Sequence, residues 1–144
     1  MSPDKLERYS FLWSEVRLVI AAFALLLGGV PPIVLILPLP GLVGLVGLLL
    51  TLSWILSGVT ALYLLYRWFQ NKQRLFGGKA PRDTVAFFIL VVSGINLGIV
   101  GVAELNIGMS ITTNYFVFVI TALLYLASAF HLHKRWKGFG KKIF

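Results

Sequence analysis

The chain has 144 residues, of which 58% are hydrophobic and only 12% are charged, and its mean hydropathy is +0.89. Soluble domains carry about 25% charged residues, so this composition excludes an ordinary soluble protein and predicts an integral membrane protein. Cysteine is absent from the sequence, which excludes disulfides, thiolate metal sites and thiol redox chemistry.

The first segment, residues 1–17, repeats apolar side chains at helical spacing, at Leu6, Tyr9, Trp13 and Val16, while its charged residues take other directions. This pattern predicts an N-terminal amphipathic helix that lies in the cytoplasmic membrane interface and leads into the first span. A secretory signal peptide is the alternative. No small-x-small cleavage site follows the apolar run, so we expect the segment to be retained.

Four spans follow from length. No charged residue occurs between Leu18 and Tyr66, and a helix needs about 20 residues to cross a bilayer, so this run holds two spans. PLPG at 38–41 separates them, because proline lacks a backbone donor and glycine tolerates turns. We therefore predict an all-α integral membrane protein with four transmembrane helices, for which two tandem two-span repeats are one arrangement. Its hairpins are 18–66 (spans 18–37 and 42–66) and 84–132 (spans 84–103 and 115–132).

Pro31 and Pro32 fall inside the first predicted span, where they remove helical hydrogen bonds. One interpretation is a kink whose freed carbonyls are satisfied by neighbouring helices. The other is a broken helix at a transport site. No polar side chain lies between Leu18 and Leu37, which favours the kink, but the sequence does not decide whether the break is functional.

The 13 basic residues all lie in three segments, 1–17, the basic loop 67–83 and the basic tail 133–144. The connections 38–41 and 104–114 carry none of them. The positive-inside rule then predicts that both termini and the central loop are cytoplasmic. We expect the membrane to be the inner (plasma) membrane of a bacterium. We expect the basic segments to attract anionic inner-leaflet lipids as well.

Two arginine-tryptophan pairs, Arg67 with Trp68 and Arg135 with Trp136, stand at the predicted inner boundaries. Amphipathic aromatic rings favour the membrane interface, so we predict that these four residues are inner-interface anchors. The sequences that end in these pairs, ALYLLYRW and AFHLHKRW, also align with one another. That alignment favours a parallel internal repeat, although apolar helices of similar composition produce the same match.

Catalytic, metal and cofactor sites are not predicted. His131 and His133 point to different sides of a helix and have no carboxylate nearby in sequence, so a solvated helix end is favoured over a metal or haem site. FGGKAP at 76–81 lacks the spacing of a phosphate-binding loop. The longest soluble segment is a short loop, so we expect no nucleic-acid partner. The sequence has no serine with a plausible base and no paired carboxylates, so we expect no enzymatic activity.

Span 84–103 carries the small residues that favour helix packing. At about 100° per residue, Gly94, Gly98 and Gly101 fall on one stripe of this helix. Small residues at this spacing let two helix backbones approach closely, so we predict that the three glycines are helix-packing positions.

The same span and its end carry a second, polar group. Ser93, Asn96 and Glu104 lie within an arc of roughly 80° on another side of the helix. Polar and ionisable groups inside a membrane are functional candidates, so these residues form a candidate polar or permeation site. The structural alternatives are an interhelical hydrogen bond for Asn96 and a solvated helix end for Glu104.

The segment ILVVSGINLGIVGVAELNIGMSI, residues 89–111, resembles the YuzA-like family of small bacterial membrane proteins with two spans. That family typically reads close to G-x-L-N-W-G-L-V-G, and Leu97 stands here in place of the tryptophan. The resemblance covers about residues 84–132 and implies a two-span unit. The function of the family is unknown, so the resemblance implies no chemistry.

Two functions follow from these features. The favoured one is a non-catalytic membrane protein that acts through helix–helix association, as a homo-oligomer or as a subunit of a larger membrane complex. The alternative is a small channel or carrier with a polar path near Asn96 and Glu104. An ion-coupled carrier usually needs an ionisable group near the middle of the membrane, and we expect Glu104 to lie at the outer mouth.

Overall fold

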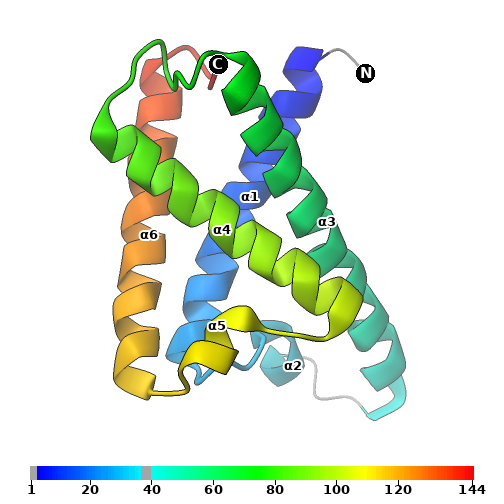
Figure 1. Ribbon diagram of the computed structural model, residues 1–144. Coiled ribbons are helices and arrows are strands. Elements are labelled where there is room, and N and C mark those ends of the chain that lie inside the picture. The colour runs from blue at the N-terminus through cyan, green and yellow to red at the C-terminus, as the bar shows by residue number, and fades with distance from the viewer. Residues whose placement is uncertain (1–2, 37–39) are drawn as a thin grey trace.

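The computed structural model describes residues 3–36 and 40–144 (Figure 1). Its elements are α1 (Pro3–Leu26), α2 (Pro32–Ile36), the 3-10 helix η1 (Pro40–Leu42), α3 (Val43–Gln70), α4 (Pro81–Ala103), α5 (Ile107–Ile111) and α6 (Tyr115–Gly138). Within the described residues, four helices (α1, α3, α4 and α6) are long and apolar enough to cross a membrane. The predicted all-α fold with four spans is confirmed.

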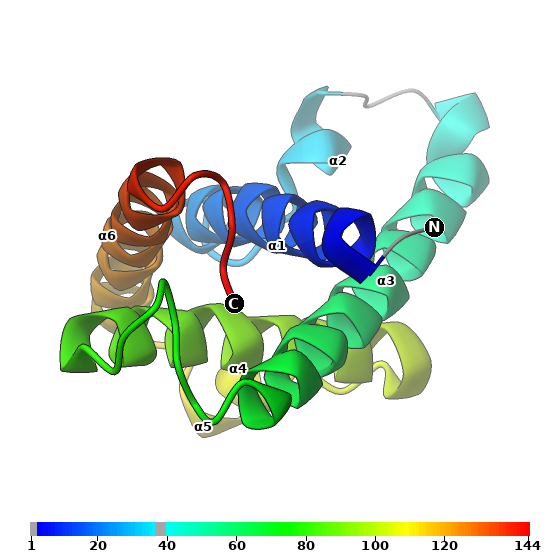
Figure 2. The ribbon, with the colours of Figure 1, turned by 90° about the horizontal axis from the view of Figure 1, so that it is seen from above.

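The long helices run alternately up and down (Figure 1). One end of the bundle holds the start of α1, the end of α3, the start of α4 and the end of α6; we call it the basic end, after Arg67, Arg82 and Arg135. The short helices α2 and α5 lie at the opposite end. Helix α3 packs mainly against α4, and α1 mainly against α6 (Figure 2), so each predicted hairpin makes its largest contact with the other.

The N-terminal segment differs from the prediction. Residues Pro3–Leu26 form one helix, and the candidate span is Asp4–Leu26, in place of an interfacial helix at 1–17 and a span at 18–37. From Ser10 on, the polar side chains of α1, among them Ser14 and Arg17, are buried in the bundle, whereas Val16 is 54% exposed. An interfacial helix turns its polar face to water, so this inverted arrangement is that of a spanning helix.

The first span also ends earlier than predicted. Gly28 and Gly29 have φ angles of +76° and +91°, a left-handed backbone that glycine adopts without steric cost. They end α1 before the prolines, and Pro32 begins α2. The structure therefore has a complete break here and not a kink within a continuous helix. Residues 37–39, which include part of the predicted PLPG break, lie outside the described residues.

The other three spans contain the predicted segments and extend beyond them at the basic end. Helix α3 continues past 66 to Gln70, α4 begins at Pro81 and α6 continues past 132 to Gly138. The basic loop is therefore shortened to about residues 71–80 and the tail to 139–144. The tail folds back onto the loop, because the Phe76 N–H donates to the Ile143 carbonyl at 2.7 Å and Ile143 is buried.

The main apolar core lies at the basic end. It includes Phe11, Leu64, Trp68, Phe87, Leu132 and Trp136. Trp68 and Trp136 are buried in this core, so the prediction that they are interface anchors is wrong for the indoles: their rings pack against other aromatic rings of the bundle, and do not face lipid headgroups. Their arginine neighbours form ion pairs, Arg67 with Glu7 and Arg135 with Asp83.

Candidate functional site: a cavity with a buried arginine

The predicted glycine stripe of α4 lies against α3 of the same chain. A Cβ atom added to Gly98 would lie 2.7 Å from the Cα of Gly58, and one added to Gly94 would lie 2.6 Å from the Cβ of Ala61. Gly101 meets the backbone of α3 in the same way. Only glycine permits this close approach, so all three predicted packing positions serve the contact between α3 and α4.

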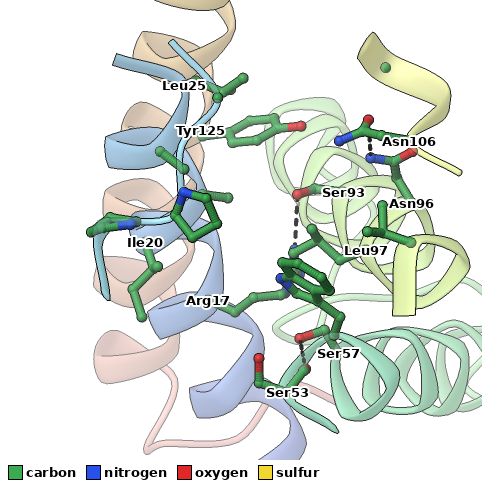
Figure 3. A pocket seen from close by; sticks show the side chains of 18 of the residues that line it. Arg17, Ile20, Leu25, Ser53, Ser57, Ser93, Asn96, Leu97, Asn106 and Tyr125 are labelled. Atoms are coloured by element: carbon green, nitrogen blue, oxygen red, sulfur yellow. Dashed lines mark hydrogen bonds between the residues drawn. The ribbon is translucent and has the colours of Figure 1, made fainter. Parts of the chain in front are cut away.

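Beyond the basic-end core, the long helices border a cavity of about 640 Å³ that is open at its side, where Val16, Ile20 and Leu49 are half exposed (Figure 3). All four of them contribute to its walls, and α2 and α5 line it at the opposite end. The volume lies within the range of about 300–1,000 Å³ that is typical of sites for small molecules. Most lining side chains are apolar, including Ile20, Leu25, Pro32, Ile33, Val117 and Phe118.

Arg17 is the one charged residue among those described as lining this cavity. Its side chain comes from the middle of α1 and is 5% exposed. Nη1 donates to the Ser93 hydroxyl at 2.9 Å and Nη2 donates to the Leu90 carbonyl at 2.7 Å, both on α4. Among the described residues no carboxylate forms an ion pair with it, and Nε has no hydrogen-bond partner. The guanidinium charge is therefore buried and uncompensated.

Further polar side chains lie beside Arg17 on the cavity wall (Figure 3). The Trp13 indole N–H donates to the Ser57 hydroxyl at 3.2 Å, and the Ser57 hydroxyl donates to the Ser53 carbonyl at 2.6 Å. Tyr125 of α6 also lines the cavity. Hydroxyl and guanidinium donors thus gather in one part of an otherwise apolar space.

The three residues of the predicted polar site, Ser93, Asn96 and Glu104, have different surroundings in the structure. Ser93 is buried and accepts from Arg17. Asn96 also lines the cavity, where its Nδ2 donates to Asn106 Oδ1 at 3.1 Å and its Oδ1 accepts from the Ile107 N–H at 2.9 Å. These bonds tie α4 to the start of α5. Glu104 is exposed at the left-handed end of α4 and is not among the residues described as lining this cavity.

The two histidines have carboxylate partners that their sequence neighbourhood did not suggest. His131 Nε2 lies 2.7 Å from Asp83 Oδ1, and His133 Nδ1 lies 3.0 Å from Glu15 Oε2. Asp83 also pairs with Arg135, at 2.9 Å. Because the carboxylates come from α4 and α1, these contacts fasten α6 to both helices, and the end of α6 is more than the solvated helix terminus that was predicted.

Arg17 is the residue that sequence reasoning misplaced, since it was assigned to the cytoplasmic basic residues before the first span. A signal was present: Ser10, Ser14 and Arg17 recur at helical spacing, and all three are buried. Ser14 faces the Thr60 hydroxyl of α3 at 3.5 Å. A polar stripe between apolar neighbours on one helix indicates a face that packs inside a membrane bundle.

No family model, no curated protein and no solved structure matches this chain. The resemblance of residues 84–132 to the YuzA-like family and the internal repeat stay predictions. Any functional proposal therefore rests on the cavity and its side chains.

Proposed function

We propose that the protein is a small membrane carrier or binding protein that holds an anion in the cavity lined by Arg17. The observation that carries this proposal is the uncompensated charge of Arg17, which is buried and in contact with a cavity. Burying an unpaired charge costs several kcal/mol, and an anion in the cavity would offset that cost. Arginines inside membrane helices generally face cavities and mark pathways for ligands or ions.

Two observations support ligand binding over helix association as the main function. The glycine stripe, which favoured a partner helix, is occupied by α3 of the same chain. A carrier needs an ionisable group within a span, and Arg17 of α1 supplies that group. Large side chains of the core, including Trp68, Phe87 and Trp136, fill the basic end. An anion could therefore cross the protein only after a conformational change, which is the behaviour of a carrier and not of an open channel.

The binding proposal can be tested with iodide, an anion that quenches tryptophan fluorescence, because Trp13 and Trp54 line the cavity. We expect saturable quenching in the wild type in neutral detergent, retained saturation in Arg17→Lys and in Arg82→Gln, and its loss in Arg17→Gln. Arg82→Gln is the control, because it removes the same charge from an exposed residue at the start of α4, outside the cavity. Equal, non-saturating quenching in wild type and Arg17→Gln, with both proteins folded, would contradict the proposal.

Association with other membrane helices, as a homo-oligomer or in a larger complex, is the second candidate function. It is favoured by Gly44 and Gly47 of α3, where an added Cβ would meet nothing within 4 Å. Val43 and Leu48 beside them are exposed, so small and apolar residues share an uncovered part of α3. Crosslinking in membranes should capture oligomers that are lost in Gly47→Leu; equal crosslinking in both proteins would remove this candidate.

We also propose that the basic end faces the cytoplasm of a bacterial cell, with anionic inner-leaflet lipids around it. The absence of native cysteine permits a direct test. Ala80 and Thr113 are exposed at opposite ends of the bundle. In intact cells, a membrane-impermeant thiol reagent should label Thr113→Cys and should reach Ala80→Cys only after permeabilisation. The reverse pattern would invert the orientation.

A further inference from the structure

The cavity is chemically uneven along its length. Arg17, Ser53 and Ser57 lie in one part of it, and the wall that runs along Ile20 and Leu25 to α2 is apolar, with Tyr125, Asn96 and Asn106 across from it (Figure 3). A small, fully hydrated anion would satisfy Arg17 but would leave the apolar part of the cavity without a partner. A ligand with a charged head and an apolar chain would match both parts.

We propose that the anion is amphiphilic: a single alkyl chain that ends in a carboxylate or a similar monoanionic head. This inference rests on the proposed function, since it requires an anion at Arg17, and it adds the class of ligand. The head would lie at Arg17 and the chain would extend between α1 and α6 toward α2.

The charge and the donors of Arg17 fit a monoanion. A guanidinium has five N–H donors; the bonds to Ser93 and Leu90 use two of them, and the Nε–H is inaccessible, which leaves one N–H on each of Nη1 and Nη2 for an anion. Arg17 is the only charged side chain among the lining residues described, so one negative charge neutralises the cavity. A dianion would bring a second, uncompensated charge into an apolar space.

The walls and the volume fit one apolar chain. Ile20 and Leu25 of α1, Pro32 and Ile33 of α2, and Val117 and Phe118 of α6 line the cavity. From Arg17 to Leu25, α1 rises about 12 Å, so the apolar wall continues well beyond the head site. The volume of about 640 Å³ is that of a site for a small molecule, and we therefore take a single-chain amphiphile over a two-chain phospholipid.

The experiment measures binding of 12-bromododecanoate to the protein in vesicles of neutral phosphatidylcholine, by equilibrium dialysis against protein-free vesicles. Ligand is expressed as its mole fraction in the membrane, so that partition into lipid is common to all probes. The comparison probes are 12-bromododecanol, which lacks the charge, and 3-bromopropanoate, which lacks the long chain. The comparison proteins are Arg17→Gln, Arg17→Lys and Arg82→Gln.

We expect saturable binding of 12-bromododecanoate, at least about tenfold tighter than 12-bromododecanol, because a hydrogen bond to a charged group contributes about 1.5–3 kcal/mol. This preference should be lost in Arg17→Gln and retained in the other two variants. On the same mole-fraction scale, binding of 3-bromopropanoate should be weaker, because its short chain leaves the apolar part of the cavity without contacts.

The other outcomes separate the two proposals. Binding of iodide and 3-bromopropanoate as tightly as 12-bromododecanoate would overturn the amphiphile and leave the anion site standing. Displacement of 12-bromododecanoate by phosphatidylglycerol added to the vesicles would overturn the single chain in favour of a membrane phospholipid. Equal binding of the alcohol and the carboxylate, or no saturable binding of any probe, would overturn both proposals.

Discussion

Replacing Gly98 with alanine tests the close contact between α3 and α4, on which the wall of the cavity depends. The new Cβ would lie 2.7 Å from the Cα of Gly58, whereas ordinary contact begins at 3.4 Å. The obstacle is backbone and not the end of a flexible side chain, so the helices must separate locally by about 0.7 Å. Overpacking of this kind costs about 1–3 kcal/mol, and the better helix propensity of alanine recovers up to about 1 kcal/mol.

We therefore expect Gly98→Ala to lower the free energy of unfolding by about 1–2 kcal/mol. The assay is unfolding by sodium dodecyl sulfate in mixed micelles, followed by circular dichroism. The matched control is Gly138→Ala in α6, where an added Cβ meets nothing within 4 Å and the change should stay within about 0.5 kcal/mol. If Gly98→Ala is as stable as the wild type while the control behaves as stated, the close contact is not as described.

Two further substitutions test the polar contacts. Asn96→Leu should lower stability by about 1–2 kcal/mol in the same assay, because it removes the hydrogen bonds that hold the start of α5. Glu104→Gln should be nearly silent, because Glu104 is exposed. A large loss of stability in Glu104→Gln would show that Glu104 belongs to the same polar contacts as Asn96. Asp83→Asn should cost about 1–3 kcal/mol, because Asp83 is buried and bonded to two side chains of α6, and exposed Asp4→Asn should cost about 0.5 kcal/mol or less. Equal stability of the two aspartate variants would show that the contact of Asp83 with α6 contributes nothing.

The sequence predicted the number of spans and the glycine face of α4 because both follow from local rules. Hydropathy over about 20 residues is sufficient to find a span. Small residues at Gly94 and Gly98 repeat at helical spacing, and a helix with that pattern packs closely on some neighbour. Which neighbour it meets depends on long-range topology, so the partner could be α3 or another chain until the fold was known.

The first span and the site were harder to predict because charged residues were counted as boundaries. Residues 7–17 carry several charged side chains, which hydropathy assigns to water, but Glu7, Glu15 and Arg17 are buried and form hydrogen bonds with residues distant in sequence. Glu15 reaches His133 and Arg17 reaches Ser93, at sequence separations of 118 and 76 residues. A single sequence does not reveal such pairs. Only the polar stripe on α1 indicated that this face was turned inward.

The most direct test of the central claim is the position of a bound anion in the protein itself. Crystals grown from a lipidic phase with 12-bromododecanoate should show its carboxylate within hydrogen-bonding distance of Arg17. The anomalous signal of bromine should lie in the apolar part of the cavity that is distant from Arg17, beside Leu25, Pro32 or Ile33. Bromine found only on the lipid-facing surface, with Arg17 bonded solely to Ser93 and Leu90, would contradict an anion site in this cavity.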